Sequence, residues 1–345
     1  MEKNISPMRI RKLLLLAMQC LITFGLLWWI FRDPAKNANM VIALRQADIG
    51  WFVPAFLCIG CASLIQAQRW TILLQVQEIR LGFWRTYRLV LIGVFFNLFL
   101  LGSTGGDVMK IFYAMREAGT KKTAAFLSVL IDRMVGLLAL VAVTAVICFF
   151  SFRELTASPV VVALLYTMGG ILVGSVGVVA CGLIVERLQW AQKIPRWFPL
   201  RKQILEMASA FSIYARDPLS CFAAFVISLP AHILFFTSFF FVAKAFTSTL
   251  TLGNIVTAMP VISTITALPI SLAGMGVREG LFETMLGTLF GTPRDVAILI
   301  SLGGFFVTLV WGLIGGALYL FYRPTGLDRD QIASEVATVE GTLEN

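Results

Sequence analysis

The sequence predicts an all-α polytopic membrane protein, and three observations favour this fold class. First, 58% of the 345 residues are apolar and only 14% are charged, whereas soluble domains average about 45–50% and 25%. Second, the apolar residues gather in runs close to the roughly 20 residues that a helix needs to cross a bilayer. Third, every stretch between these runs is too short to fold a core of its own. A soluble catalytic domain of any size is therefore excluded.

Six apolar runs are long enough to cross the membrane as complete helices. The first run is longer than the core of a signal peptide and has no small-residue cleavage site, so we interpret it as a retained span. The six runs are residues 13–31, 51–68, 123–150, 160–185, 219–241 and 296–322. One transmembrane domain is thus expected over residues 1–322. Residues 323–345 are acidic and poor in apolar side chains, which is typical of a disordered tail.

Two further apolar runs are interrupted by glycine or proline. Residues 89–101 end at the break Gly102-Ser-Thr-Gly-Gly-Asp107, and residues 255–272, which contain two prolines, end at the break Gly274-Met-Gly-Val-Arg-Glu279. Interrupted segments in corresponding places of two halves are typical of transporters with a site at the bilayer midplane. The two breaks also resemble each other, which indicates an inverted repeat, with chance similarity of glycine-rich sequence as the alternative.

The distribution of basic residues predicts the orientation of the chain. If both interrupted segments are re-entrant, the loops on the side of the N-terminus carry 20 Lys and Arg residues and the loops on the other side carry seven. Lys and Arg favour the cytoplasmic side, so both termini are expected in the cytoplasm. Two complete crossings in place of the re-entrant pair would also keep the N-terminus inside.

Six ionisable residues lie at membrane depth, where each costs about 2.5–3.5 kcal/mol to insert. They are Asp107, Lys110, Asp132, Arg133, Arg278 and Glu279. Because three are cationic and three are anionic, one interpretation is a set of internal ion pairs that hold the broken segments together. The other interpretation is a binding site for an anion of phosphate size, and the two can hold together.

The anion-site hypothesis depends on the arginines and on the glycines of the two breaks. Arg133 and Arg278 can bind phosphate oxygens in a bidentate manner, with Lys110 as a further cation. Glycine lets the main chain approach a ligand, and helix N-termini that begin at the breaks would direct backbone N–H groups at an anion. The predicted substrate-binding residues are Arg133, Arg278, Lys110, Asp107, Asp132, Glu279, Gly105, Gly106, Gly274, Gly276, Ser103 and Ser271.

Other motifs carry less specific signals. His232, the only histidine, lies within a span as either a proton relay or a satisfied interior polar group. Cys58 and Cys61 have helical spacing but no further ligand nearby, so they are interpreted as buried filler and no metal site is predicted. The pairs Gly170-xxx-Gly174 and Gly312-xxx-Gly316 predict close helix contacts.

Neither a cofactor nor a nucleic-acid partner is predicted. The glycine run at residues 102–106 lacks the Gly-Lys-Ser/Thr of a nucleotide-binding loop. The net charge of +9 comes from basic residues that cluster beside the apolar runs, where they report orientation and lipid contact instead of a nucleic-acid surface.

Five stretches together resemble the family of the lysylphosphatidylglycerol synthase transmembrane region, a group of flippase-like polytopic proteins. They are Arg69-Trp70 with Leu73-Leu74, Phe95-Phe96-Asn97, the first break, Ser128-Val-Leu-Ile-Asp-Arg133, and residues 268–279. Leu101 and Lys110 depart from the family pattern, which has proline and arginine there. The resemblance implies movement of a lipid or lipid-linked headgroup between leaflets of the bacterial inner membrane. It also implies a stand-alone member without the soluble aminoacyl-transferase domain.

The leading hypothesis is therefore a flippase-type transporter, with a phosphate-bearing lipid as substrate and membrane lipids as partners. A membrane-embedded lipid-modifying enzyme is a second hypothesis, in which Asp107, Asp132 or Glu279 acts as acid or base. The sequence shows no nucleophile and base near the breaks to support it. A third hypothesis is a non-transporting partner of a separately encoded lipid synthase.

Overall fold

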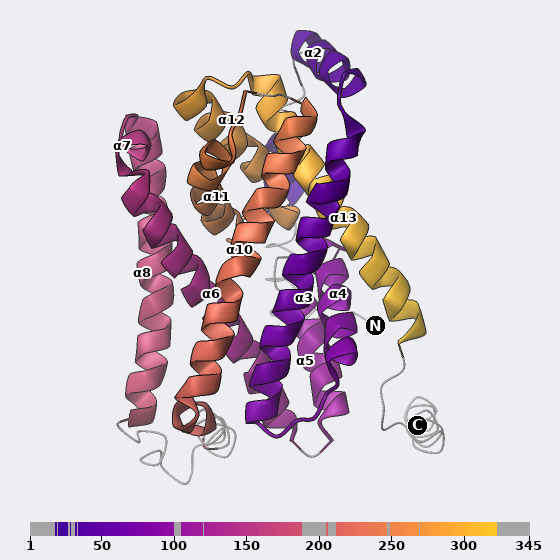
Figure 1. The fold of residues 1–345 in the computed structure, drawn as a ribbon, viewed down its shortest axis with the longest axis vertical. Coiled ribbons are helices and arrows are strands. Elements are labelled where there is room, and N and C mark those ends of the chain that lie inside the picture. The colour runs from indigo at the N-terminus through magenta and orange to yellow at the C-terminus, as the bar shows by residue number, and fades with distance from the viewer. Residues whose placement is uncertain are drawn as a thin grey trace, which may run out of the picture.

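The computed structural model describes residues 18, 20–26, 28, 32, 34–99, 105–119, 121–187, 205, 212–246, 249–268 and 270–322. These residues form helices and no strand (Figure 1). Four of the described helical segments are long and apolar enough to cross a membrane: Ile49–Val76, Lys122–Phe150, Pro218–Phe246 and Arg294–Phe321. The predicted all-α polytopic membrane fold is confirmed. Most of the predicted first span and all of the predicted acidic tail lie outside the described residues.

The long helices alternate with short ones along the chain. The long helices are α3 (Phe52–Val76), α6 (Lys122–Phe150), α8 (Pro159–Arg187), α10 (Pro218–Phe246) and α13 (Arg294–Phe321). The short helices are α2 (Pro34–Arg45), η1 (Ile49–Trp51), α4 (Phe83–Phe99), α5 (Gly105–Glu117), α7 (Phe152–Leu155), α11 (Leu252–Thr266), η3 (Leu272–Gly274) and α12 (Val277–Phe290).

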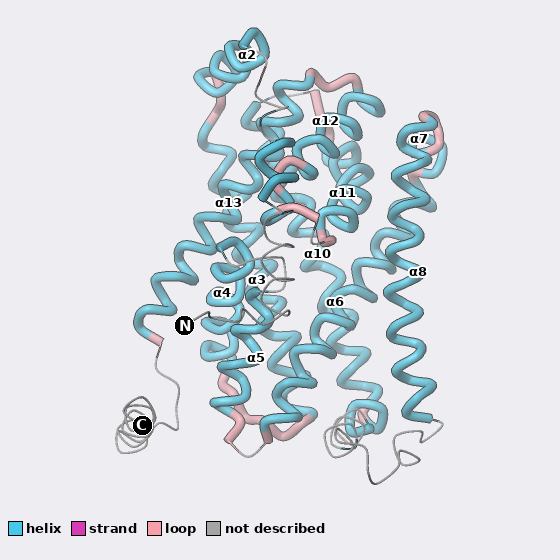
Figure 2. The backbone as a smooth tube through the Cα atoms, turned by 180° about the vertical axis from the view of Figure 1, so that it is seen from behind, coloured by secondary structure: helices cyan, strands magenta, loops and turns pink. Residues whose placement is uncertain are grey.

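The two interrupted segments form helical hairpins that enter the bundle from opposite ends. Helices α4 and α5 lie in the lower half of Figure 1, at the end that carries the turn between α3 and α4. Helices α11 and α12 lie in the upper half, at the end that carries α2 and α7, and the reverse view in Figure 2 agrees. Each hairpin leaves by the end at which it entered, so both segments are re-entrant.

The element order repeats with opposite orientation in the two halves of the chain. A long helix, a re-entrant hairpin and a second long helix follow each other as α3, α4–α5 and α6, and again as α10, α11–α12 and α13. The first hairpin enters from below and the second from above (Figure 1). This arrangement is the inverted repeat that the similarity of the two breaks indicates.

The second break is a non-helical turn because its backbone is left-handed at three positions. Ala273, Gly274 and Gly276 have φ angles of +50°, +73° and +82°. Such angles suit glycine and cannot continue an α-helix. The N-terminal segment lies against this turn, since the Leu272 N–H donates to the Thr23 hydroxyl at 2.9 Å.

One of the two predicted glycine pairs makes a close helix contact. A Cβ atom added at Gly312 or Gly316 would lie 2.4 Å or 2.7 Å from side chains of α4, and the contact between α13 and α4 is as close at Gly315. The prediction is wrong for Gly170 and Gly174, because an added Cβ would meet no described atom within 4 Å at either position. A close contact requires a partner helix beside the two glycines, and the spacing of the glycines does not show whether such a helix is there.

Candidate functional site

The tips of the two hairpins meet inside the bundle. Helix α4 of the first hairpin contacts η3, the short turn at the tip of the second. Both views of the backbone place this meeting point between the two ends of the long helices (Figures 1 and 2). The two hairpins, whose breaks are more than 150 residues apart in sequence, thus meet inside the bundle.

The first charge cluster consists of Arg69, Lys110 and Asp132, contributed by α3, α5 and α6. The Arg69 Nε donates to Asp132 Oδ1 at 2.6 Å, and Lys110 Nζ lies 4.0 Å from Asp132 Oδ2. All three residues are buried. Lys110 also lies over the ring of Trp70, with 5.4 Å between Nζ and the ring centroid. One carboxylate therefore holds two buried cations.

Glycines make room for these long cationic side chains. A Cβ atom at Gly93 would lie 3.0 Å from Lys110 Cε, and a Cβ atom at Gly136 would lie 2.7 Å from Arg69 Nη1. Arg69 Nη1 in turn donates to the Ser228 hydroxyl of α10 at 3.3 Å. The first cluster thus joins α3, α5, α6 and α10.

Asp107 and Arg133 form an ion pair between α5 and α6 beside the first cluster. The Arg133 side chain is 44% exposed, and the Asp107 side chain is 16% exposed. This pair is consequently more accessible than the Arg69–Asp132 pair, whose side chains are 9% and 5% exposed.

The second charge cluster consists of Arg278, Glu279 and Ser301, contributed by α12 and α13. Arg278 Nη2 donates to Glu279 Oε1 at 2.7 Å, and Arg278 Nε donates to the Ser301 hydroxyl at 2.9 Å. The Ser301 hydroxyl donates to the same carboxylate at 2.9 Å. Glu279 is fully buried, and the Arg278 guanidinium lies 4.7 Å from the ring centroid of Phe305.

The expectation of free backbone N–H groups at the breaks is wrong for four residues. The Gly106 N–H donates to Asn97 Oδ1 at 2.8 Å, and the Gly276 N–H donates to the Glu279 carboxylate. The Gly274 and Met275 N–H groups donate to backbone carbonyls within the turn. Such donors lie buried, so the chain satisfies them itself and no longer offers them to an anion.

Glycine at the first break serves helix contact. Gly105 and Gly106 begin α5 and are buried. A Cβ atom added at Gly106 would lie 2.0 Å from the carbonyl oxygen of Gly93 on α4. Only glycine permits that approach of two backbones.

Of the two serines in the predicted site, the structure describes only Ser271. Ser103 lies outside the described residues. Ser271 is buried at the start of η3, and its hydroxyl has no hydrogen-bond partner in the described part of the chain. The structure thus distributes the predicted residues over two clusters, with Arg133 in contact with Asp107 and Arg278 in contact with Glu279.

Arg69 is the important residue that charge counting placed incorrectly. The predicted span 51–68 ends just before Arg69, whereas α3 continues past this residue to Val76. The apolar residues Leu73 and Leu74, buried in the structure, are the signal that the helix extends beyond Arg69. Lys110, expected at membrane depth, lies buried in α5.

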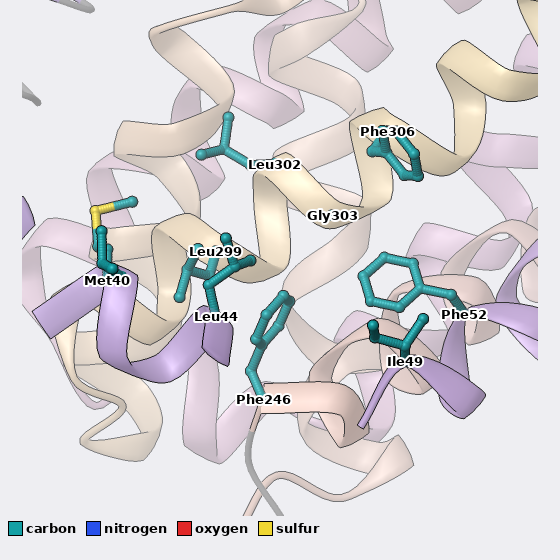
Figure 3. Close-up of a pocket in the computed structure, with 10 residues that line it drawn as sticks. Met40, Leu44, Ile49, Phe52, Phe246, Leu299, Leu302, Gly303 and Phe306 are labelled. Carbon is teal, nitrogen blue, oxygen red and sulfur yellow. The ribbon is translucent and has the colours of Figure 1, made fainter. Parts of the chain in front are cut away.

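An apolar pocket of about 690 Å³ lies at the upper end of the bundle (Figure 3). It is bounded by α2, η1, α3, the end of α10, and α13, and its lining includes Leu44, Phe52, Phe246 and Phe306. None of the described side chains that line it is polar. The pocket therefore offers nothing that could bind a charged group, and recognition of an anion is left to the charge clusters.

Comparison with known proteins gives one result. The sequence pattern of the lysylphosphatidylglycerol synthase TM region matches residues 16–316. The chain belongs to this family. Neither a curated protein nor a solved structure matches it.

Membership of the lysylphosphatidylglycerol synthase TM region family identifies a membrane protein linked to lipid handling. The matched region contains both re-entrant hairpins and both charge clusters. Two of the stretches that resemble the family contribute residues to the first cluster: Arg69-Trp70, and the segment that ends with Asp132-Arg133.

Proposed function

We propose that this chain is a flippase-type transporter that moves a phosphate-bearing lipid or lipid-linked headgroup between the leaflets of the membrane. One observation carries the proposal. In the first cluster two buried cations, Arg69 and Lys110, share the single carboxylate of Asp132. With Arg69 included, the charges at membrane depth are four cations and three anions, so the balance expected from the sequence is replaced by an excess of one positive charge.

An unbalanced buried cation is costly in a medium of low polarity. A phosphate group on the headgroup of a lipid would supply the missing negative charge while its tails remain in the bilayer. The cluster lies beside the junction of two hairpins that open toward opposite ends, which is where a transporter with an inverted repeat binds its substrate.

The other charged residues have supporting roles in this proposal. Arg133 is the accessible cation at the first hairpin and Arg278 its counterpart at the second, so each would contact the headgroup on its own side. Asp107, Asp132 and Glu279 orient the cations and prevent binding so tight that the headgroup is not released. The proposal includes no cofactor and no chemical change of the lipid.

The test is a translocation assay with purified protein in vesicles that contain a fluorescent anionic phospholipid. Lys110→Gln removes one of the two cations that share Asp132 and is expected to lower the initial rate at least about tenfold, since a hydrogen bond to a charged group contributes about 1.5–3 kcal/mol. Arg116→Gln is the matched control, because Arg116 is an exposed cation of the same helix. Arg133→Ala and Arg278→Ala are expected to abolish translocation without unfolding the protein.

Three outcomes contradict the proposal. Unchanged rates in Lys110→Gln, Arg133→Ala and Arg278→Ala would exclude the assigned roles. A change in the mass of the lipid after incubation would favour the enzyme hypothesis. Translocation that requires a separately encoded synthase would favour the partner hypothesis.

A further inference from the structure

The only histidine of the chain lies next to the first charge cluster and has no role in the function proposed above. His232 is on α10, and its Nε2 lies 3.0 Å from the carbonyl oxygen of Gly136 on α6. A carbonyl oxygen can only accept a hydrogen bond, so Nε2 carries the hydrogen in this contact. The other ring nitrogen, Nδ1, then remains as the atom that can take up a proton.

A polar cavity of about 290 Å³ adjoins this histidine. Its polar groups come from Gln66 and Arg69 of α3, His232 of α10 and Ser263 of α11, and the rest of its lining is apolar or glycine. The Ser263 hydroxyl is inaccessible to solvent and has no hydrogen-bond partner in the described part of the chain. The volume is sufficient for several water molecules, each of which occupies about 30 Å³ in the liquid. The cavity is therefore large enough to hold water beside His232.

Arg69 connects the cavity to the first cluster. Its guanidinium lines the cavity together with His232, while its Nε donates to Asp132 and its Nη1 donates to Ser228. Ser228 is one helical turn before His232 on α10, and Gly136 is one turn after Asp132 on α6. The histidine and the carboxylate thus approach one guanidinium from two helices.

Arg69 is the charged group that faces His232 across the cavity. Asp132 of α6 acts on the histidine through Arg69, and Lys110 of α5 lies beyond Asp132. Helix α11 contributes only the Ser263 hydroxyl. Helix α13 and η1, which also pack against α10, carry their charged neighbours at the upper end of the bundle. Protonation of His232 would consequently place a second positive charge beside Arg69.

We propose that His232 is a proton-binding site whose protonation is linked to occupancy of the first cluster by an anionic phosphate group. This inference rests on the proposed function, because it takes the headgroup phosphate as the anion. An anion at the cluster offsets the repulsion between Arg69 and a protonated His232. Each ligand then raises the affinity for the other by the same factor. Headgroup binding is therefore stronger at low pH, and protons accompany the headgroup across the membrane.

Because His232 is the only histidine of the chain, every histidine signal in the test comes from this residue. Protein labelled with ¹⁵N-histidine, freed of any affinity tag and held in detergent micelles, is titrated through about pH 5 to 8, where histidine changes its charge. The probes are dihexanoyl phosphatidylglycerol and inorganic phosphate, and dihexanoylglycerol, which lacks phosphate, is the control. The phosphatidylglycerol is expected to raise the midpoint of the His232 titration by about one pH unit, a roughly tenfold coupling within the usual range for linked sites.

The probes also separate the two sources of phosphate. An equal rise with inorganic phosphate means that the site recognises the phosphate alone, and a rise only with the lipid means that the glycerol backbone or chains are required. A midpoint that neither phosphate probe moves, or a ring that remains uncharged throughout the titration, overturns the proposal. So does an equal rise with dihexanoylglycerol.

A second measurement separates this inference from the proposed function. His232→Gln keeps an N–H for the Gly136 carbonyl but cannot be protonated, so its translocation rate is expected to lose the pH dependence of the natural chain. If translocation depends on Lys110 but the phosphate probes do not move the midpoint of the His232 titration, only the linkage is overturned. A midpoint that shifts in a chain that translocates nothing would overturn the transport function alone.

Discussion

Individual residues show how partners stabilise charged side chains at membrane depth. Asp132 binds two cations from two other helices, and the Trp70 ring lies against one of them. Asp107 and Arg133 form a pair with much greater exposure. Burial and shared partners therefore make Asp132 the carboxylate on which the first cluster depends most.

Replacement of Asp132 by asparagine is expected to destabilise the fold by about 3–5 kcal/mol, because it leaves Arg69 and Lys110 buried without a counter-charge. Asp107→Asn is the matched control and is expected to cost about 1 kcal/mol or less, as partly exposed ion pairs do. Unfolding of purified protein by SDS in mixed micelles measures both free energies. Equal losses would show that the two pairs are similarly solvated.

At the scale of the elements, glycines allow two pairs of helices to approach closely. Gly106 brings α5 against α4, and Gly315 brings α13 against the same helix from another side. Helix α4 is thus held between α5 and α13 by contacts of backbone on backbone. Such contacts fix the depth at which Lys110 and Asp107 lie, because both residues follow Gly106 within about one turn of α5.

Gly106→Ala is expected to destabilise the protein by about 1–3 kcal/mol, because the added methyl group overpacks the contact between α4 and α5. The control is Gly170→Ala, at a position where an added Cβ meets no described atom within 4 Å. That change is expected to be neutral or stabilising by up to about 1 kcal/mol through helix propensity. The same SDS titration compares them, and a harmless Gly106→Ala would mean that the hairpin can separate without cost.

At the scale of the whole molecule, the two hairpins enter the bundle from opposite ends and meet in its interior. The basic residues of the described part are unevenly divided between the ends. At the lower end are Arg80, Arg85, Arg88, Arg116, Lys121, Lys122, Arg187 and Arg216, and at the upper end are Arg32, Lys36, Arg45, Arg153, Lys244 and Arg294. The lower end is accordingly expected to face the cytoplasm of a bacterial cell.

A cysteine at position 157, in the turn after α7, is expected to react with a membrane-impermeant maleimide added to intact cells whose outer membrane has been made permeable. A cysteine at position 80 is expected to react only after the inner membrane is opened. The variants Ala157→Cys and Arg80→Cys are made in a background without the natural cysteines, and both positions are exposed. The reverse pattern of labelling would invert the orientation.

Much of the architecture follows from local sequence. The lengths of the apolar runs predict the long helices, and the glycine and proline breaks predict two re-entrant segments, because both depend on neighbouring residues in the chain. The same holds for the pair formed by Arg278 and Glu279, which are adjacent. The end of α3 is an exception. Gln68 and Arg69 are polar and predict that the span ends there, but the helix continues because tertiary partners satisfy the arginine.

The sequence by itself determined that the chain is a helical membrane protein with two broken segments and a small set of charges at membrane depth. Hydropathy and backbone propensity decide these features within a few residues. Only the tertiary structure decided which charges share a partner and which glycine N–H groups are occupied. Arg69 meets Asp132 across 63 residues of chain, and the Gly106 N–H meets Asn97 through the fold of a hairpin. Contacts of this kind depend on how the helices pack, so they cannot be predicted from local sequence patterns.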